Sequence, residues 1–546
     1  MNQCAQCTSS FEITNKDRKF YKTLDLPDPS MCPDCRNQRR ISFRNFFNLY
    51  HRKCDLTGKQ IISMYDVDSP CTVYDMHEWW SDKWDPLNYG FDFDFKHPVF
   101  DQLKVLHEEV PRMNIMNTQC ENTDYCVFSF HSKDCYLVFG NVENENCYYG
   151  HIVWHSKNCF DCLYTYRSEY CYECVDCVES YGLSFSQNCD NCSESKFLVN
   201  CQGSRNCFGC VGLNNKEYHI FNKPYSKADY ESKMKEFNSG NYKLIAIAKQ
   251  EVDKLIGNEV VKHYHGYNSE NITGDYLYNC KNVFDSYDAK NCEDSRFLAT
   301  AESFNNSYDC NYSPALSEWC YNCCTVYGQS LLMCHAVNNN SANLSYCDNC
   351  YGCKDCFGCC GLKYKKYCIF NKQYTRENYE TLKTKIIECM KKTGEWGEFF
   401  PASFSPFAYN ETMANEYHPL DHNQAESLGY TWKNLNSDNG YKGPIYQIPD
   451  DIKDVPDTIC KEILVCEVAR KPYKIIPQEL KFYHDHNLPI PHICWEERHK
   501  KRMKLRNPRK LVNRTCEKCS TPFQTTYSPE RPEKVYCEQC YLKHVL

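Results

Sequence analysis

Two sets of four cysteines, one near each end of the chain, have the spacing of metal ligands. Each set consists of two Cys-x2-Cys pairs, and a tight turn through such a pair aims both sulfur atoms at one ion. Four thiolates complete a tetrahedron and leave no position for a substrate, so the sequence predicts two zinc-ribbon modules with about two structural Zn2+ ions. The predicted ligands are Cys4, Cys7, Cys32 and Cys35 in the first set, and Cys516, Cys519, Cys537 and Cys540 in the second.

An altered copy of the first module precedes the second. The segment FYKTLDLPDPSMCPDCRNQRRISFRN, from Phe20, aligns without gaps with FYHDHNLPIPHICWEERHKKRMKLRN, from Phe482. Most of the arginines match, but Glu497 stands where the first copy has Cys35. We therefore expect a degenerate ribbon-like module here. The sequence leaves open a degenerate metal site, whose candidate ligands are Cys460, Cys466 and Cys494.

Basic residues gather beside these cysteines, although the chain as a whole carries a net charge of −8. The stretches 36–53 and 498–514 contain no Asp or Glu. Two basic segments on an acidic chain suggest a polyanionic partner, and we predict contact with nucleic acid or a ribonucleoprotein. The candidate contacts are Arg36, Arg39, Arg40, Arg44, Lys500, Lys501, Arg502, Lys504, Arg506, Arg509 and Lys510.

Cysteines in the middle of the chain recur at intervals of six or twelve residues, as at Cys135, Cys147, Cys159 and Cys171. A helical period of 3.6 does not generate this spacing, whereas short strands joined by polar turns do. Hexapeptide periods are typical of a parallel β-helix, so we expect coils of about 18 residues that stack about 4.8 Å apart.

This region is duplicated. The segment NCQGSRNCFGCVGLNNKEYHIFNKPYSKADYE, from Asn200, returns as NCYGCKDCFGCCGLKYKKYCIFNKQYTRENYE, from Asn349. Each copy ends in a predicted helix with a good N-cap, Ser226 or Thr375, which would cover the open end of a stack. The predicted fold is mainly β: tandem hexapeptide-period β-solenoids with capping helices, flanked by terminal zinc-ribbon modules.

The role of the cysteines inside these solenoids has three interpretations. Cysteine is a small side chain that packs well in a narrow interior, and this interpretation is favoured. Pairs such as Cys159 and Cys162, or the run from Cys347 to Cys359, could instead bind metal. Stacked coils would also bring thiols close enough for disulfides.

The sequence divides into eight segments. The terminal segments are the zinc ribbons, and the middle ones are the solenoids and their connections. In order they are a zinc ribbon with a basic face (1–53), a small aromatic-rich α/β segment (54–115), the first solenoid with its capping helix (116–240), a helical connector (241–270), the second solenoid with its capping helix (271–390), an irregular connector (391–455), the degenerate module (456–512) and the C-terminal zinc ribbon (513–546).

Catalytic motifs of the GxSxG, GxGxxG, GKS/T and HExxH types do not occur in the sequence, which predicts that the protein is not an enzyme. There is neither an apolar run of membrane-spanning length nor an apolar stretch near the N-terminus that would direct secretion. The 42 cysteines should therefore stay reduced, as in the cytoplasm, or in a virion if the source is viral.

Several stretches resemble a family of uncharacterised cysteine-rich zinc-ribbon proteins of uncultured small-genome bacteria and giant viruses. They are LPDPSMCPDCRNQRR, RKCDLTGKQIIS, WWSDKWDPLNYG and FGCVGLNNKEYHIFNKPYS. The resemblance covers most of the chain and implies zinc binding by both terminal cysteine sets. It implies no activity, and Glu497 departs from the ligand pattern.

The leading hypothesis for function is a non-catalytic zinc-binding scaffold or interaction protein that contacts nucleic acid or a ribonucleoprotein through its basic terminal modules. One alternative is a thiol-rich metal or redox store that uses the solenoid cysteines. Another is a purely structural protein–protein scaffold. No membrane partner is expected.

Overall fold

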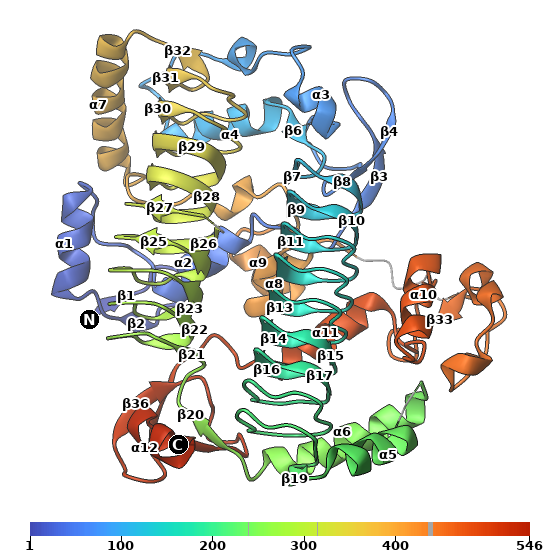
Figure 1. Cartoon of the computed structure of the whole chain (residues 1–546). Helices are drawn as coiled ribbons and strands as arrows, with labels where there is room; N and C mark the ends of the chain where they lie inside the picture. Colours follow the sequence, from blue (N-terminus) through green and yellow to red (C-terminus); the bar gives the residue numbers. More distant parts are fainter. Residues whose placement is uncertain (238–239, 314, 435–440, 546) are drawn as a thin grey trace.

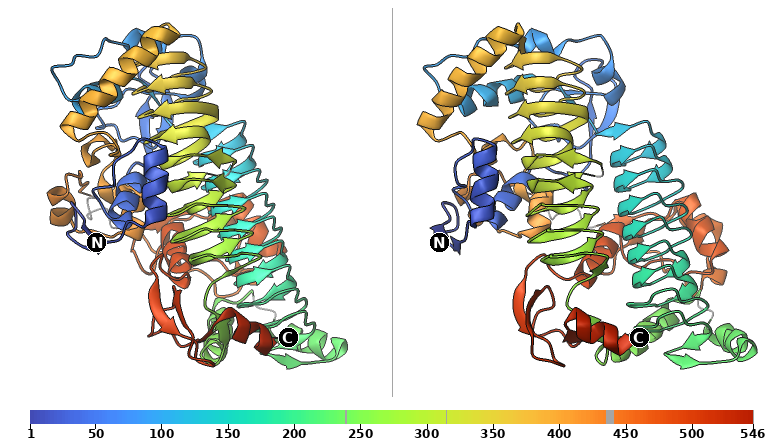
Figure 2. Two further views of the ribbon diagram at one scale, coloured as in Figure 1. Left: turned by 90° about the vertical axis from the view of Figure 1, so that its left-hand side faces the viewer. Right: turned by 60° about the vertical axis from the view of Figure 1, so that its left-hand side comes forward.

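Two tall stacks of short parallel strands stand side by side, and the rest of the chain packs around them (Figures 1 and 2). The computed structural model describes residues 1–237, 240–313, 315–434 and 441–545. Residues 435–440, part of the predicted irregular connector, lie outside the described residues. The prediction of a mainly β chain with ribbon-like modules at both ends is confirmed.

The first stack contains a seven-stranded sheet in the order β16-β14-β13-β12-β11-β9-β7, with the parallel pairs β8–β10 and β15–β17 beside it. Its strands are β7 (Asn117–Thr118), β8 (Glu121–Asp124), β9 (Val127–Phe130), β10 (Lys133–Tyr136), β11 (Phe139–Val142), β12 (His151–Trp154), β13 (Leu163–Tyr166), β14 (Val175–Val178), β15 (Tyr181–Ser184), β16 (Gln187–Asp190) and β17 (Ser193–Lys196).

The second stack is a twelve-stranded sheet. Its strands are β21 (Gly266–Tyr267), β22 (Gly274–Tyr278), β23 (Ser286–Lys290), β24 (Ala299–Glu302), β25 (Phe304–Asn305), β26 (Tyr308–Ser313), β27 (Ser317–Glu318), β28 (Tyr321–Leu332), β29 (His335–Ser345), β30 (Lys354–Phe357), β31 (Lys366–Ile369) and β32 (Lys372–Gln373).

Helices lie outside the stacks (Figure 1). They are α1 (Asn15–Thr23), α2 (Pro33–Ile41), α3 (Met76–Trp80), α4 (Val99–Glu109), α5 (Lys227–Phe237), α6 (Tyr242–Ile256), α7 (Arg376–Thr393), α8 (Met413–Tyr417), α9 (His422–Ser427), α10 (Pro477–Asp485), α11 (Trp495–Leu505) and α12 (Glu538–Val545). The helices α5 and α7 begin directly after Ser226 and Thr375, as expected, and both hydroxyls accept a backbone N–H of the first turn.

Parallel partners in the first stack are twelve residues apart: Phe139 pairs with His151, His151 with Leu163, and Leu163 with Val175. The second stack keeps mostly the same offset, as where Gly274 pairs with Ser286. The expected layer of about 18 residues is therefore wrong, because each layer holds two hexapeptides and not three.

The backbone turns at every third residue. Between Asn146 and Asp176, each third residue has a positive φ of 48–57°, although none of them is glycine. Such a conformation bends the chain sharply at a single residue, and Asn and Asp tolerate it best after glycine. Twelve residues thus contain four turns, and the residue that follows each turn points inward.

This three-residue rule explains the cysteine spacing. The inward positions hold small buried side chains, among them Cys159, Cys162, Ser168 and Cys171. A Cys-x2-Cys pair in a stack is therefore two successive inward residues, and the six-residue period in the sequence is a multiple of three. Cysteines that are three residues out of phase with that period still point inward.

Thiols and hydroxyls at the inward positions make the same hydrogen bond to the backbone. The Cys159 thiol lies 3.2 Å from the carbonyl oxygen of Lys157, two residues before it, and can donate to it. The Ser168 hydroxyl donates in the same way to Tyr166 at 2.9 Å. Both side chains satisfy a carbonyl group at the turn, so either residue suits this interior.

Replacing a turn residue tests the three-residue rule. Asn191 is exposed and has a φ of 50°, so Asn191→Val should reduce the free energy of unfolding by about 1–2 kcal/mol, because a β-branched residue resists this conformation. Urea denaturation would measure the change. Asn191→Gly should be close to neutral, and Ser193→Val, on the adjoining strand, should change stability by less than about 0.5 kcal/mol. Equal losses at residues 191 and 193 would contradict the rule.

Candidate metal centres

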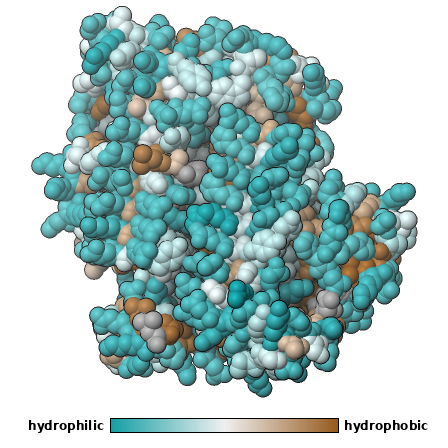
Figure 3. Space-filling view, viewed as in Figure 1, coloured by the Kyte–Doolittle hydropathy of each residue, from teal (hydrophilic) through white to brown (hydrophobic). Residues whose placement is uncertain are grey.

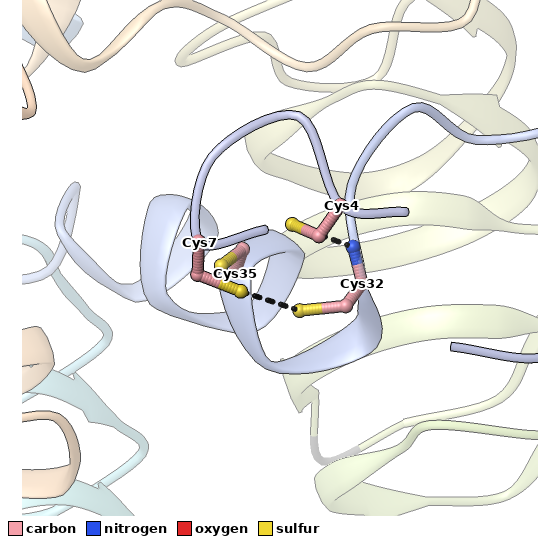
Figure 4. Close-up of side chains that lie close together, drawn as sticks. All are labelled: Cys4, Cys7, Cys32 and Cys35. Atoms are coloured by element: carbon pink, nitrogen blue, oxygen red, sulfur yellow. Dashed lines mark hydrogen bonds between the residues drawn. The ribbon is translucent and has the colours of Figure 1, made fainter. Parts of the chain in front are cut away.

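The four N-terminal cysteines converge as the sequence predicts. The turn between β1 (Asn2–Gln3) and β2 (Ser10–Phe11) carries Cys4 and Cys7, whereas Cys32 and Cys35 lie at the start of α2. All four sulfur atoms lie within 4.8 Å of one another and face a common centre (Figure 4). The Cys7 and Cys32 sulfurs are 3.7 Å apart. Four thiols at this separation could hold a metal ion.

Two interactions in the N-terminal site stabilise a thiolate. The Cys35 thiol, as a hydrogen-bond donor, lowers the pKa of Cys32 to about 5. The backbone N–H of Cys32 donates to the Cys4 sulfur at 3.2 Å. Helix N-termini and N–H donors both stabilise negative sulfur, which is the form that binds metal.

The C-terminal cysteines form a second, more exposed cluster. The turn between β35 (Val512–Thr515) and β36 (Pro522–Thr525) carries Cys516 and Cys519, and Cys537 and Cys540 follow β37 (Lys534–Tyr536). The four sulfurs again lie within 4.8 Å of one another. Hydrogen bonding from Thr521 lowers the pKa of Cys519 to about 6. This cluster could also hold a metal ion.

The cysteine turn occurs four times in the described chain, and one copy was not foreseen. It starts at Cys4, Cys54, Cys466 and Cys516, and each time the N–H four residues later donates to the cysteine carbonyl at 2.8–3.0 Å. The residues that donate are Thr8, Gly58, Arg470 and Ser520, all with positive φ.

The unforeseen copy lies in the segment predicted to be an aromatic-rich α/β piece. The turn joins β3 (Tyr50–Lys53) to β4 (Gln60–Ser63), and α3 follows. Thr57, Asp75 and Glu78 occupy the places of the other three cysteines. The N–H of Asp75 donates to the Cys54 sulfur at 3.2 Å, as Cys32 does to Cys4. The signal in the sequence is one cysteine before Leu-Thr-Gly, too short to recognise.

The degenerate module keeps the turn but does not assemble a ligand set. Within the described residues, Cys460, Cys466 and Cys494 do not form a group of three ligands within 4.8 Å. Cys460 lies in the short helix Asp457–Lys461 and packs against a different apolar cluster from the other two. Glu497 is paired with Lys500 at 2.7 Å. The degenerate site is thus corrected to a pair of thiols.

The arginines beside the metal clusters are not a free surface. Arg36 and Arg40, from α2, both bind Asp309 of the second stack, at 2.9 and 3.0 Å. All three side chains are at most 3% exposed. Burial alone would lower the pKa of Arg36, but Asp309 raises it above its usual range, so the ion pair is charged.

The degenerate module makes the equivalent contact with the first stack. Arg498 and Arg502, from α11, both bind Asp161 at 2.9 Å. The two modules also make equivalent aromatic contacts. Phe20 stacks on Tyr308 with ring centroids 4.0 Å apart, and Phe482 stacks on Phe160 with ring centroids 3.8 Å apart. The two modules therefore dock in the same way on duplicated parts of the two stacks.

The next arginine after each docking pair, Arg44 or Arg506, reaches both stacks. Arg506 binds Asp176 of the first stack at 2.8 Å and also pairs with Asp288 of the second. Arg44 lies over Phe128 of the first stack and Tyr312 of the second, 3.7 and 4.4 Å from the ring centroids. These side chains join the stacks to each other.

These contacts correct the list of candidate nucleic-acid contacts. Buried ion pairs or aromatic contacts occupy seven arginines of the basic stretches, which therefore present no charge to a phosphate: Arg36, Arg40, Arg44, Arg498, Arg502, Arg506 and Arg509. Arg39 is half-buried. The exposed candidates that remain are Lys500, Lys501, Lys504 and Lys510.

The cysteines of the two stacks are not gathered into metal cages. Among the described residues, the groups of three or more ligands within 4.8 Å are the two terminal clusters and one buried set, His107, Asp348 and Cys360. Cys360 is one residue beyond the inward position of Cys359, so it does not belong to the interior column. No described helix combines the length and apolar character needed to cross a membrane.

Comparison with known proteins identifies no family for this chain. No protein-family model matches the chain, and no curated protein does. One solved structure, described as a "putative acetyltransferase" from Desulfovibrio desulfuricans G20, is 9% identical and covers 50% of this chain and 81% of its own, with a TM-score of 0.10. A score this low supports no argument about fold or activity. Catalysis is neither confirmed nor excluded by it.

Metal analysis tests the terminal clusters. Cys7→Ser and Cys519→Ser should each remove one ion per chain from anaerobically purified protein, because three thiolates bind far more weakly than four. Mass spectrometry of the metal content would measure the loss. Cys171→Ser, in the stack interior, should leave the content unchanged. A large content that falls with Cys171→Ser would instead indicate a metal store.

Double-mutant analysis tests the docking arginines. Arg502→Met leaves Arg498 to balance two buried carboxylates, Asp161 and Glu479, so the free energy of unfolding should fall by about 3–5 kcal/mol. Adding Asp161→Asn should recover part of this loss, since the uncompensated charge is removed. The exposed neighbour provides the control: Lys501→Met should change stability by less than about 0.5 kcal/mol. Additive losses would argue against a coupled pair.

Proposed function

We propose that this protein is a non-catalytic scaffold in which two β-solenoids are fastened together by zinc-ribbon modules. The observation that carries the proposal is the repeated docking of paired arginines on a buried aspartate, Asp309 in one stack and Asp161 in the other. These arginines bind other parts of the same chain, so their role is to hold the fold together. The twelve-residue register and the turn at every third residue support a solenoid in each stack.

Zinc is the ion that suits the terminal clusters best. Four thiolates in a closed set are typical of structural Zn2+ sites, since zinc accepts tetrahedral sulfur ligands and has no redox chemistry. The C-terminal module is held through a parallel pair between β37 and β20 (Val260–Lys262). The ion would therefore stabilise a module that closes the connection between the stacks.

The exposed face of α11 is the part of the basic stretch that remains for a partner. Lys500, Lys501 and Lys504 point away from the buried arginines of the same helix, and Lys510 follows. Hydrophilic side chains cover most of the molecular face in Figure 3. We propose that this lysine face contacts single-stranded RNA or a ribonucleoprotein through backbone phosphates.

Binding measurements test the lysine face. Replacing Lys500, Lys501, Lys504 and Lys510 with Glu should reduce affinity for single-stranded RNA at least about tenfold and flatten its salt dependence, because fewer counterions are released. Fluorescence anisotropy at several salt concentrations would measure both.

A matched control separates this face from net charge. Lys233, Lys235, Lys385 and Lys392 are also exposed, and their replacement with Glu changes the total charge equally. Binding should survive in that variant. Equal losses in the two variants, or no binding by the wild-type chain, would reject the nucleic-acid partner and leave a protein–protein scaffold.

A further inference from the structure

A third set of metal-ligand side chains lies buried between helix α4 and the second stack. His107 comes from α4, Asp348 follows β29, and Cys360 lies between β30 and β31. Their ligand atoms are within 4.8 Å of one another, and His107 Nδ1 is 3.7 Å from an Asp348 oxygen. All three residues are at most 3% exposed. The set is remote in sequence from both terminal clusters.

Neither nitrogen of the His107 ring has a hydrogen-bond partner among the described residues, although the side chain is buried. An unsatisfied polar atom in such a position costs about 1–3 kcal/mol. An imidazole beside a carboxylate and a thiol has the composition of a metal ligand set.

Neighbouring groups hold the carboxylate in position. One Asp348 oxygen lies 2.8 Å from His335 Nδ1 and accepts the Asn349 amide at 3.0 Å. The other oxygen accepts from Arg112 at 2.9 Å and faces His107. Hydrogen-bonding neighbours of this kind orient the carboxylate ligands of metal sites.

We propose that His107, Asp348 and Cys360 bind a divalent transition-metal ion. Zn2+ is the ion that a mixed nitrogen, oxygen and sulfur set suits best. The ion would tie α4 to the second stack. This site goes beyond the ribbon centres and does not depend on them.

Metal counting on the full chain tests the proposal. Anaerobically purified protein should carry three ions per chain, and His107→Phe should carry two, since phenylalanine fits beside Phe400 and Phe404 but cannot ligate. His151→Phe is the matched control, because His151 is equally buried with both nitrogens unpaired yet belongs to no ligand group in the described chain. It should keep three ions.

A second measurement separates this site from the ribbons. The double variant Cys7→Ser with Cys519→Ser should retain one ion. When cobalt replaces that ion, the double variant should show thiolate-to-cobalt absorption, and adding Cys360→Ser should reduce this absorption. A double variant without metal, or wild-type protein with two ions and no effect of His107→Phe, would overturn the proposal. A wild-type chain with one ion, which is lost in His107→Phe, would support this site and reject only the two terminal centres.

Discussion

The buried pairing of arginine with aspartate is the interaction on which the arrangement of this molecule depends. Asp161 and Asp309 are completely buried, and each must be neutralised, since an isolated buried carboxylate is strongly unfavourable. Two arginines one helical turn apart meet each aspartate. This requirement fixes the position of α2 on one stack and of α11 on the other, and the next arginine along the chain then reaches across to the opposite stack.

The same aspartates also suit the backbone of the stacks. Asp161 and Asp309 have φ values of 54° and 58°, so each occupies one of the turns that recur at every third residue. Aspartate accepts this conformation more readily than most residues. Each aspartate therefore both forms a turn of the stack and binds the docking arginines. When the stack was duplicated, the docking site was duplicated with it.

The two modules that dock through arginines differ in their sets of possible metal ligands. The degenerate module keeps the cysteine turn, the aromatic stacking of Phe482 and the arginine pair, yet it has lost the four-thiol set. Docking therefore relies on the arginines and the aromatic rings rather than on the ion. In the N-terminal module the ion would instead fix the short turn that carries Cys4, which has little apolar core of its own.

Local features of this fold could be predicted from the sequence, and distant partners could not. The terminal ligands were predictable because Cys4 and Cys7, or Cys516 and Cys519, share one tight turn. The layer length was not, since a six-residue recurrence fits any multiple of six. The role of Arg502 was hidden because its partner, Asp161, lies more than three hundred residues away and resembles a surface residue. A basic stretch in a sequence is thus a basic surface only if its acidic partners are elsewhere. Here they lie directly beneath the arginines, so the fold neutralises the arginines of the basic stretches and leaves the lysines at the surface.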